Sequence, residues 1–133
     1  SLSQMTKNVH SLEEKTIIID FAHTPDAIAN ICSATKQAFP NSELHLVFGC
    51  GGDRDKAKRP LMGKAAVLGA DKIYVTSDNP RFESPEAIIQ DILEGINAEV
   101  TVIVKREDAI KEAFNKMKGG DVLIIAGKGH ENY

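Results

Sequence analysis

The sequence predicts a Rossmann-like α/β domain: a mostly parallel sheet with helices on both faces. Five short apolar runs alternate with four segments of helical periodicity along the whole chain, which is typical of this class. The 133 residues suffice for one domain with a proper core. With 42% hydrophobic and 26% charged residues, the composition matches globular proteins and argues against disorder. We expect a polar arm over 1–15 and one domain over 16–133.

The first half of the chain predicts two strands and two helices. Thr16–Asp20 is a β-branched run and indicates a buried strand. Thr24, Pro25 and Asp26 then provide a cap, a proline at the first helical position and an acid in the first turn, which predicts a helix that Pro40 ends. A strand over 44–48 follows, and then a helix over 59–68 that Gly69 closes.

The second half repeats the alternation. We expect a strand over 72–76, a strand over 100–104, a helix over 107–117 and a last strand over 122–126. Between the first two of these strands, Ser84, Pro85 and Glu86 start a helix that runs from Pro85 to about Ile96. Ligands of parallel sheets bind beyond the carboxyl ends of the strands. The loops at that edge are therefore the places to look for function.

Composition excludes several classes of function. The net charge of −3 gives no basic footprint for nucleic acid, and with few aromatic residues and no tryptophan there is no stacking platform for single strands. Cys32 and Cys50 do not make a disulfide framework, so we expect reduced thiols in a cytoplasmic protein. No apolar run is long enough to cross a bilayer, and no signal peptide is visible. We expect neither nucleic acid nor membrane insertion.

The loop over 49–55 reads GCGGDRD and begins like a nucleotide-binding turn. The third glycine of a dinucleotide fingerprint would fall at Arg54, and the chain has no Walker motif. A tight turn with close backbone packing explains the glycines equally well. Four basic residues, Arg54, Lys56, Lys58 and Arg59, follow the glycines. Such a run is usually surface charge, but at the ligand edge we expect at least Arg54 to meet an anion.

The loop over 78–81 carries an acid, an amide and a guanidinium around a proline: Asp78, Asn79, Pro80 and Arg81. An arginine fork matches a carboxylate and an aspartate accepts from an ammonium group, so the pair suits a ligand with both groups. These are also ordinary turn residues, and a well-capped turn is the equal alternative.

Asp20 and His23 follow the first strand. Carboxylates at strand ends commonly hold ribose hydroxyls, whereas His23 alone is as consistent with a plain turn. The four histidines show no metal-ligand spacing, and no serine or cysteine lies beside a base in a known motif. We expect no metal ligand and no catalytic residue in this domain.

Four motifs occur in order: DFAHTPDA at 20–27, GCGGDRDKAKRPLMGKAA at 49–66, TSDNPRFESPEAIIQDI at 76–92 and AGKGHENY at 126–133. Together they resemble the C-terminal domain of the Mur ligases, and within that family the tripeptide synthetases. The resemblance covers the chain from Thr16 onward. Phe21 departs from it, because the family pattern has tyrosine there. The chain also ends at Tyr133, so we expect the final segment of the domain to be missing.

The resemblance implies one domain of a three-domain bacterial enzyme of peptidoglycan synthesis. Such an enzyme uses ATP and Mg²⁺ to phosphorylate the D-glutamate of UDP-MurNAc-L-Ala-D-Glu, and an incoming amine attacks the acyl phosphate. The resemblance assigns the P-loop and Mg²⁺ ligands to the central domain and the UDP site to the N-terminal domain. The C-terminal domain supplies the amino-acid pocket and closes over the central one. As a separate polypeptide it is expected to be inactive.

The resemblance also implies roles for single residues. Those matching the pocket for meso-diaminopimelate are Arg54, Asp78, Asn79, Pro80, Arg81, Gly127 and Glu131, and those matching the adenosine side of the ATP site are Asp20 and His23. Because lysine lacks the distal carboxylate that would justify Arg81, we expect diaminopimelate as substrate. Two alternatives stay open: a lysine-adding homologue, and a stand-alone nucleotide- or anion-binding module.

Overall fold

A computed structural model describes residues 14–52 and 55–127. It contains a five-stranded sheet in the order β1-β5-β2-β3-β4, in which every pair is parallel. The strands are β1 (Thr16–Asp20), β2 (Leu44–Phe48), β3 (Lys72–Val75), β4 (Thr101–Val102) and β5 (Val122–Ala126). The predicted parallel sheet is confirmed.

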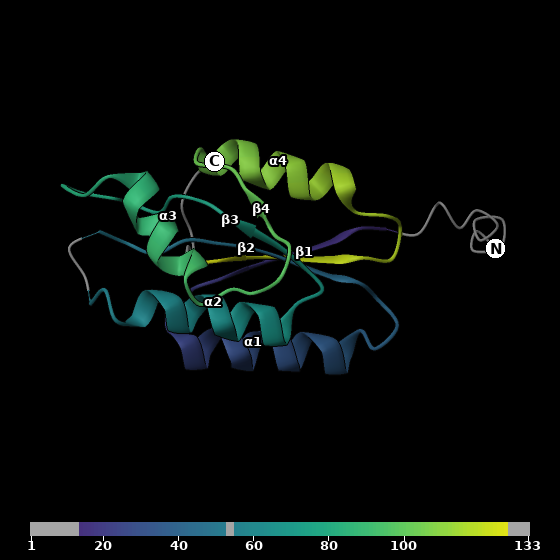
Figure 1. Ribbon diagram of the computed structural model, residues 1–133. Helices are drawn as coiled ribbons and strands as arrows, with labels where there is room; N and C mark the ends of the chain where they lie inside the picture. The colour runs from purple at the N-terminus through teal and green to yellow at the C-terminus, as the bar shows by residue number, and fades with distance from the viewer. Residues whose placement is uncertain (1–13, 53–54, 128–133) are drawn as a thin grey trace, which may run out of the picture.

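Four helices cover the sheet on its two faces (Figure 1). They are α1 (Pro25–Ala38), α2 (Lys58–Gly69), α3 (Pro85–Leu93) and α4 (Arg106–Lys116). Residues of α1, α2 and α3 share one buried cluster with the sheet, and residues of α4 share a second cluster with the opposite face. This arrangement confirms the Rossmann-like α/β fold class.

The two central strands explain the two clusters. Every residue of β2 and β5 is buried, and alternate side chains point to opposite faces. Leu46 and Ile124 pack in the cluster of α1, α2 and α3, while Val47 and Ile125 pack against α4. Because both faces are covered, these strands are apolar almost throughout, as expected for a parallel sheet.

Two helix starts follow the predicted chemistry. The hydroxyl of Thr24 accepts a hydrogen bond from Ala27 N at 3.1 Å, and that of Ser84 accepts one from Ala87 N at 3.3 Å. A proline opens each helix, where its missing N–H costs no hydrogen bond. These caps fix where the chain leaves the loops after β1 and β3.

Two elements end more than one residue away from the predicted position, and the other bounds agree to within one residue. Helix α3 ends at Leu93 and not near Ile96. Directly after it, Gly95 packs against α2 so closely that a Cβ atom on Gly95 would lie 1.8 Å from the Pro60 carbonyl oxygen. Strand β4 covers Thr101–Val102 instead of 100–104, because this edge strand has β3 alone as its neighbour.

Within the described parts of the chain, no helix has both the length and the apolar character needed to span a bilayer.

Candidate functional site

The loops that follow β1, β2 and β3 meet at the carboxyl edge of the sheet, where their described residues and Gly127, directly after β5, line a cavity of about 500 Å³. Its described lining residues are His23, Thr24, Gly49, Cys50, Gly51, Asp55, Lys58, Arg59, Met62, Asp78, Asn79, Arg81 and Gly127. The predicted ligand edge therefore carries a cavity with both charge signs.

The loop after β3 has an unusual backbone. Asn79 and Arg81 have φ values of 45° and 54°, on either side of Pro80. Left-handed φ is uncommon for a residue other than glycine, and for each it costs on the order of 1 kcal/mol or more. Such conformations persist where surrounding contacts hold them, and they cluster at binding sites.

The glycine loop after β2 supplies those contacts. Gly52 N donates to the Asn79 carbonyl at 3.0 Å, and Arg81 Nη1 donates to the Gly52 carbonyl at 2.6 Å. A Cβ atom on Gly52 would lie 1.8 Å from the Pro80 carbonyl oxygen, and one on Gly49 would lie 2.3 Å from that of Thr76. Of the two explanations for these glycines, the structure supports close backbone packing between the loops.

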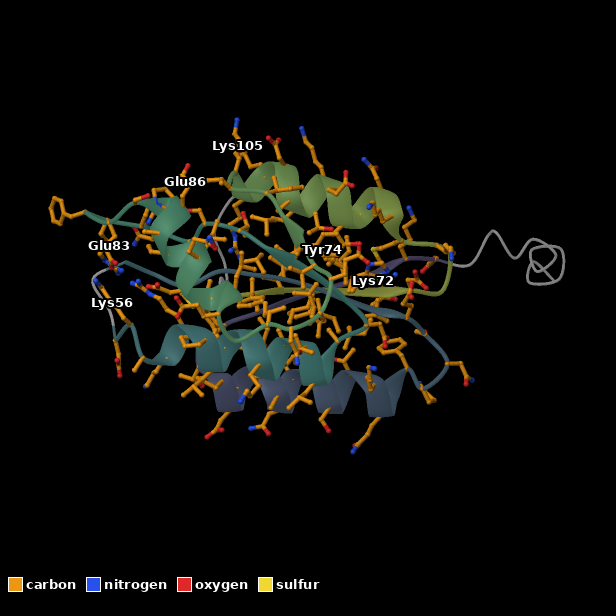
Figure 2. The ribbon with its side chains drawn as sticks, in the orientation of Figure 1. Lys56, Lys72, Tyr74, Glu83, Glu86 and Lys105 are labelled. Atoms are coloured by element: carbon orange, nitrogen blue, oxygen red, sulfur yellow. The ribbon has the colours of Figure 1, made fainter. Side chains whose placement is uncertain are left out.

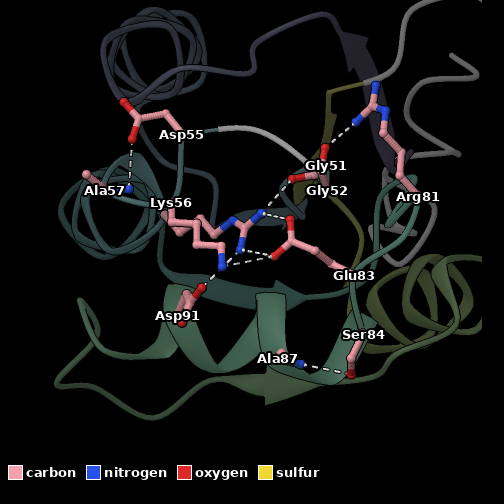
Figure 3. A network of polar contacts seen from close by, with 11 residues as sticks. Gly51, Gly52, Asp55, Lys56, Ala57, Arg81, Glu83, Ser84, Ala87 and Asp91 are labelled. Atoms are coloured by element: carbon pink, nitrogen blue, oxygen red, sulfur yellow. Dashed lines mark hydrogen bonds and ion pairs between the residues drawn. The ribbon is translucent and has the colours of Figure 1, made fainter.

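Arg59 departs from the expected surface charge. It is 1% exposed, and its guanidinium forms ion pairs with the carboxylates of Glu83 and Asp91, both labelled in Figure 3. Nη2 donates to Glu83 Oε1 at 2.7 Å, and Nη1 donates to Glu83 Oε2 and to Asp91 Oδ2, each at 3.0 Å. Nη2 also donates to the Gly51 carbonyl at 3.1 Å. Arg59 therefore ties the glycine loop to the loop after β3 and to α3.

The electrostatics of Arg59 agree with this bridging role. The hydrogen bond to Glu83 raises the pKa of the guanidinium, against the opposing effect of burial, and the bond to Asp91 raises it further. Lys56, by contrast, is 71% exposed and lies 3.9 Å from Glu83 (Figure 2). The expectation of a surface cluster is thus wrong for Arg59, and it holds for Lys56.

Gly127, directly after β5, closes the site on the other side. Its φ of 92° suits glycine, and a Cβ atom there would lie 3.1 Å from Asp78 Oδ2. Its N–H donates to the Asp20 carbonyl at 2.9 Å. The carboxylate of Asp78 therefore approaches the backbone at the end of β5, inside the cavity.

The loop after β1 carries the two residues assigned to the adenosine side. Asp20 Oδ2 accepts from Ala22 N at 2.9 Å, and His23 Nδ1 lies 2.9 Å from the Phe21 carbonyl oxygen. His23 lines the cavity, whereas Asp20 is not among its described lining residues and is linked to it by the backbone bond from Gly127. The ring of Phe21 is exposed.

The structure brings five of the predicted site residues together around the cavity: His23, Asp78, Asn79, Arg81 and Gly127. Pro80 contributes its carbonyl contact with Gly52 rather than a lining side chain. Arg54 and Glu131 lie outside the described residues. The lining residues that sequence reasoning missed include Asp55 and Met62, and their only signal was their position beside the glycine loop.

Cys50 also lines the cavity. Burial raises the pKa of its thiol to about 12, against the smaller opposing effect of Arg59. The thiol therefore stays protonated near neutral pH and is a poor nucleophile.

The chain is similar to known proteins over nearly all its length. Residues 6–129 match the family described as Mur ligase, glutamate ligase domain. The chain is 54% identical over 121 residues to a UDP-N-acetylmuramoyl-L-alanyl-D-glutamate–2,6-diaminopimelate ligase of Clostridioides difficile, and 53% identical over 127 residues to that of Aquifex aeolicus. These alignments cover 89% and 94% of the chain, but 25% and 26% of the relatives.

A solved structure of a protein with the same name superposes on the chain with a TM-score of 0.84 and 47% sequence identity. The superposition covers 91% of this chain and 25% of that one. The chain thus spans about a quarter of the length of the relatives that it matches.

Proposed function

The chain belongs to the Mur ligase family, as its glutamate ligase domain, and on that basis we propose that it is the amino-acid-binding part of an ATP-dependent amide ligase. The substrate that we propose for this part is meso-diaminopimelate, which the whole ligase joins to UDP-MurNAc-L-Ala-D-Glu. The similar proteins of Clostridioides difficile and Aquifex aeolicus carry that activity in their names. The proposal includes a cytoplasmic location in a bacterium.

The observation that carries the proposal is that Arg81 and Asp78, which have opposite charges, line the same cavity. Arg81 is exposed, and its hydrogen bond to the Gly52 carbonyl occupies one of the five N–H donors of the guanidinium. Diaminopimelate differs from lysine by a carboxylate on the distal carbon. Arg81 offers that carboxylate a fork, and Asp78 accepts from the neighbouring ammonium group.

We assign the remaining recognition to the residues around this pair. Asn79 offers an amide to the same ligand, Gly127 offers close backbone approach, and Arg54 and Glu131 complete the pocket by their match to the family motifs. On the other side, Asp20 and His23 face the ATP ribose and adenine. In this arrangement the chain binds and orients an amine for attack on an acyl phosphate, which is catalysis by positioning.

ATP and Mg²⁺ require more than this edge offers. Among the described residues, one group of three side chains lies close enough together to hold a metal ion: Glu43, His45 and Asp121. None of these three residues lines the cavity. Among the described residues of the cavity, no three carboxylate, histidine or cysteine side chains are grouped in this way. We therefore propose that the other domains of the ligase hold the phosphates and the metal ion, and that this chain alone has no ligase activity.

Two alternatives make different predictions. A lysine-adding ligase would bind lysine at least as tightly as diaminopimelate. A stand-alone nucleotide-binding module would bind ATP without the other domains, at better than about millimolar. Gly49 and Gly52 pack against backbone atoms of the loop after β3. This packing argues against a phosphate-binding role for the two glycines, and so against the nucleotide-binding alternative.

Calorimetric titration with meso-diaminopimelate, L-lysine and MgATP distinguishes the three. We expect diaminopimelate to bind at least about tenfold more tightly than lysine, because a charge-assisted hydrogen bond contributes about 1.5–3 kcal/mol. Arg81→Ala should remove that preference and leave lysine affinity within about threefold. Tighter binding of lysine than of diaminopimelate would contradict the proposed substrate. Submillimolar binding of MgATP without any binding of diaminopimelate would contradict the proposed role as an amino-acid-binding domain.

A further inference from the structure

A second group of polar side chains lies at the amino edge of the sheet, where β2 and β5 begin. His45 is 1% exposed, and its Nε2 lies 3.1 Å from Asp121 Oδ2 and 3.7 Å from Glu43 Oε1. The three candidate ligand atoms lie within 4.8 Å of one another. Lys72 and Tyr74, which neighbour this group, lie away from Lys56 and Glu83 in Figure 2. The group is thus separate from the cavity at the carboxyl edge.

We propose that Glu43, His45 and Asp121 bind a divalent transition-metal ion of the Zn²⁺ type. One imidazole and two carboxylates form a ligand set that Zn²⁺ accepts, with a fourth position left for water. With metal–ligand bonds of about 2.0–2.1 Å, the ligand atoms of a tetrahedral site lie about 3.4 Å apart. The distances of 3.1 and 3.7 Å from Nε2 bracket that value.

The surroundings of His45 are those of a supported metal ligand. Its Nδ1 lies 3.0 Å from the hydroxyl of Tyr74, which can either donate or accept a hydrogen bond. When Nδ1 carries the hydrogen and donates to Tyr74, the lone pair of Nε2 faces the carboxylates and is available to a metal. Without a metal, the other tautomer lets Nε2–H donate to Asp121.

The carboxylate of Asp121 is also fixed. Its Oδ2 accepts a hydrogen bond from Lys118 N at 3.0 Å, in the turn after α4. Two ligands are therefore held before any ion binds, and Glu43 supplies the third from the solvent side.

An ion could enter from a cavity of about 460 Å³ at this edge. Its lining includes two acids, Glu43 and Glu99, and three lysines, Lys72, Lys116 and Lys118. The lysines oppose a cation, although Lys116 lies 3.3 Å from Glu112 and is partly neutralised. We therefore expect a dissociation constant on the order of micromolar, weaker than that of closed structural zinc sites.

Calorimetric titration of the 133-residue chain with ZnCl₂ tests the site. We expect one ion per chain, and Glu43→Gln should weaken binding by at least about tenfold. The side chain of Glu43 is 37% exposed, so this variant should keep the fold and is the deciding one. Glu86→Gln, the same change on an exposed residue of α3, is the matched control and should bind as the unchanged chain does.

Cobalt substitution identifies the ligands. We expect a four-coordinate visible spectrum with no near-ultraviolet sulfur-to-cobalt band, because Cys32 and Cys50 are not in the site. Tyr74→Phe should weaken binding by less than Glu43→Gln does. Unchanged affinity in Glu43→Gln, a sulfur-to-cobalt band, or no binding at about 100 µM Zn²⁺ overturns the proposal.

Discussion

Replacing Arg59 with methionine is expected to lower the free energy of unfolding by about 3 kcal/mol. The change leaves Glu83 and Asp91 without the guanidinium that lies between them, and it frees the Gly51 carbonyl. The two acidic side chains are 19% and 34% exposed, so water compensates part of the loss. For that reason we place the effect at the low end of the range for a broken buried ion pair.

Urea unfolding followed by circular dichroism measures this effect. Lys56→Met is the matched control, since Lys56 lies 3.9 Å from the same Glu83 but is 71% exposed, and it should cost less than about 0.5 kcal/mol. Adding Glu83→Gln to Arg59→Met should recover part of the loss, because one of the two carboxylates that lost the guanidinium becomes neutral. Equal stability of Arg59→Met and Lys56→Met would show that the bridge does not hold the loops.

Replacing Gly52 with alanine is expected to weaken diaminopimelate binding by about a hundredfold. The new Cβ atom would lie 1.8 Å from the Pro80 carbonyl oxygen, so one of the two loops must move by about an ångström or more. That movement also disturbs the bond from Arg81 to the Gly52 carbonyl and the bond from Gly52 N to Asn79.

The comparison with lysine separates this effect from that of Arg81. Gly52→Ala shifts the whole loop and should weaken both ligands to a similar degree, whereas Arg81→Ala should act on diaminopimelate alone. Calorimetry with both ligands provides the measurement, and urea unfolding should show a loss of about 1–3 kcal/mol for Gly52→Ala. Affinities within about threefold of the unchanged chain would contradict the role given to this contact.

Much of the fold could be predicted because its signals are local. Thr24 and Ser84 each stand before a proline at a helix start, and both cap their helices as expected. The apolar runs that become β2 and β5 are buried on both faces, which a single sequence window reveals. The ligand edge followed in turn, because parallel strands bring their carboxyl ends together.

The parts that could not be predicted depend on long-range contacts. Arg59 looked like one more basic residue in a charged run, but its partners Glu83 and Asp91 lie 24 and 32 positions further along the chain. His45 likewise lies 76 positions from Asp121. No spacing rule relates such residues, so the histidines gave no metal signal in the sequence. The ends of α3 and β4 were also set by neighbouring elements.

The measurement that tests the proposed amino-acid site most directly is a ¹H–¹⁵N NMR titration of the chain with meso-diaminopimelate, with L-lysine in parallel. If the account is right, the largest shifts with diaminopimelate fall on the amides of Gly49–Gly52, Asp78, Asn79, Arg81 and Gly127, and lysine produces smaller shifts at the same concentration. The account is contradicted if the shifts lie away from the carboxyl edge of the sheet, or if lysine perturbs these amides as strongly as diaminopimelate does.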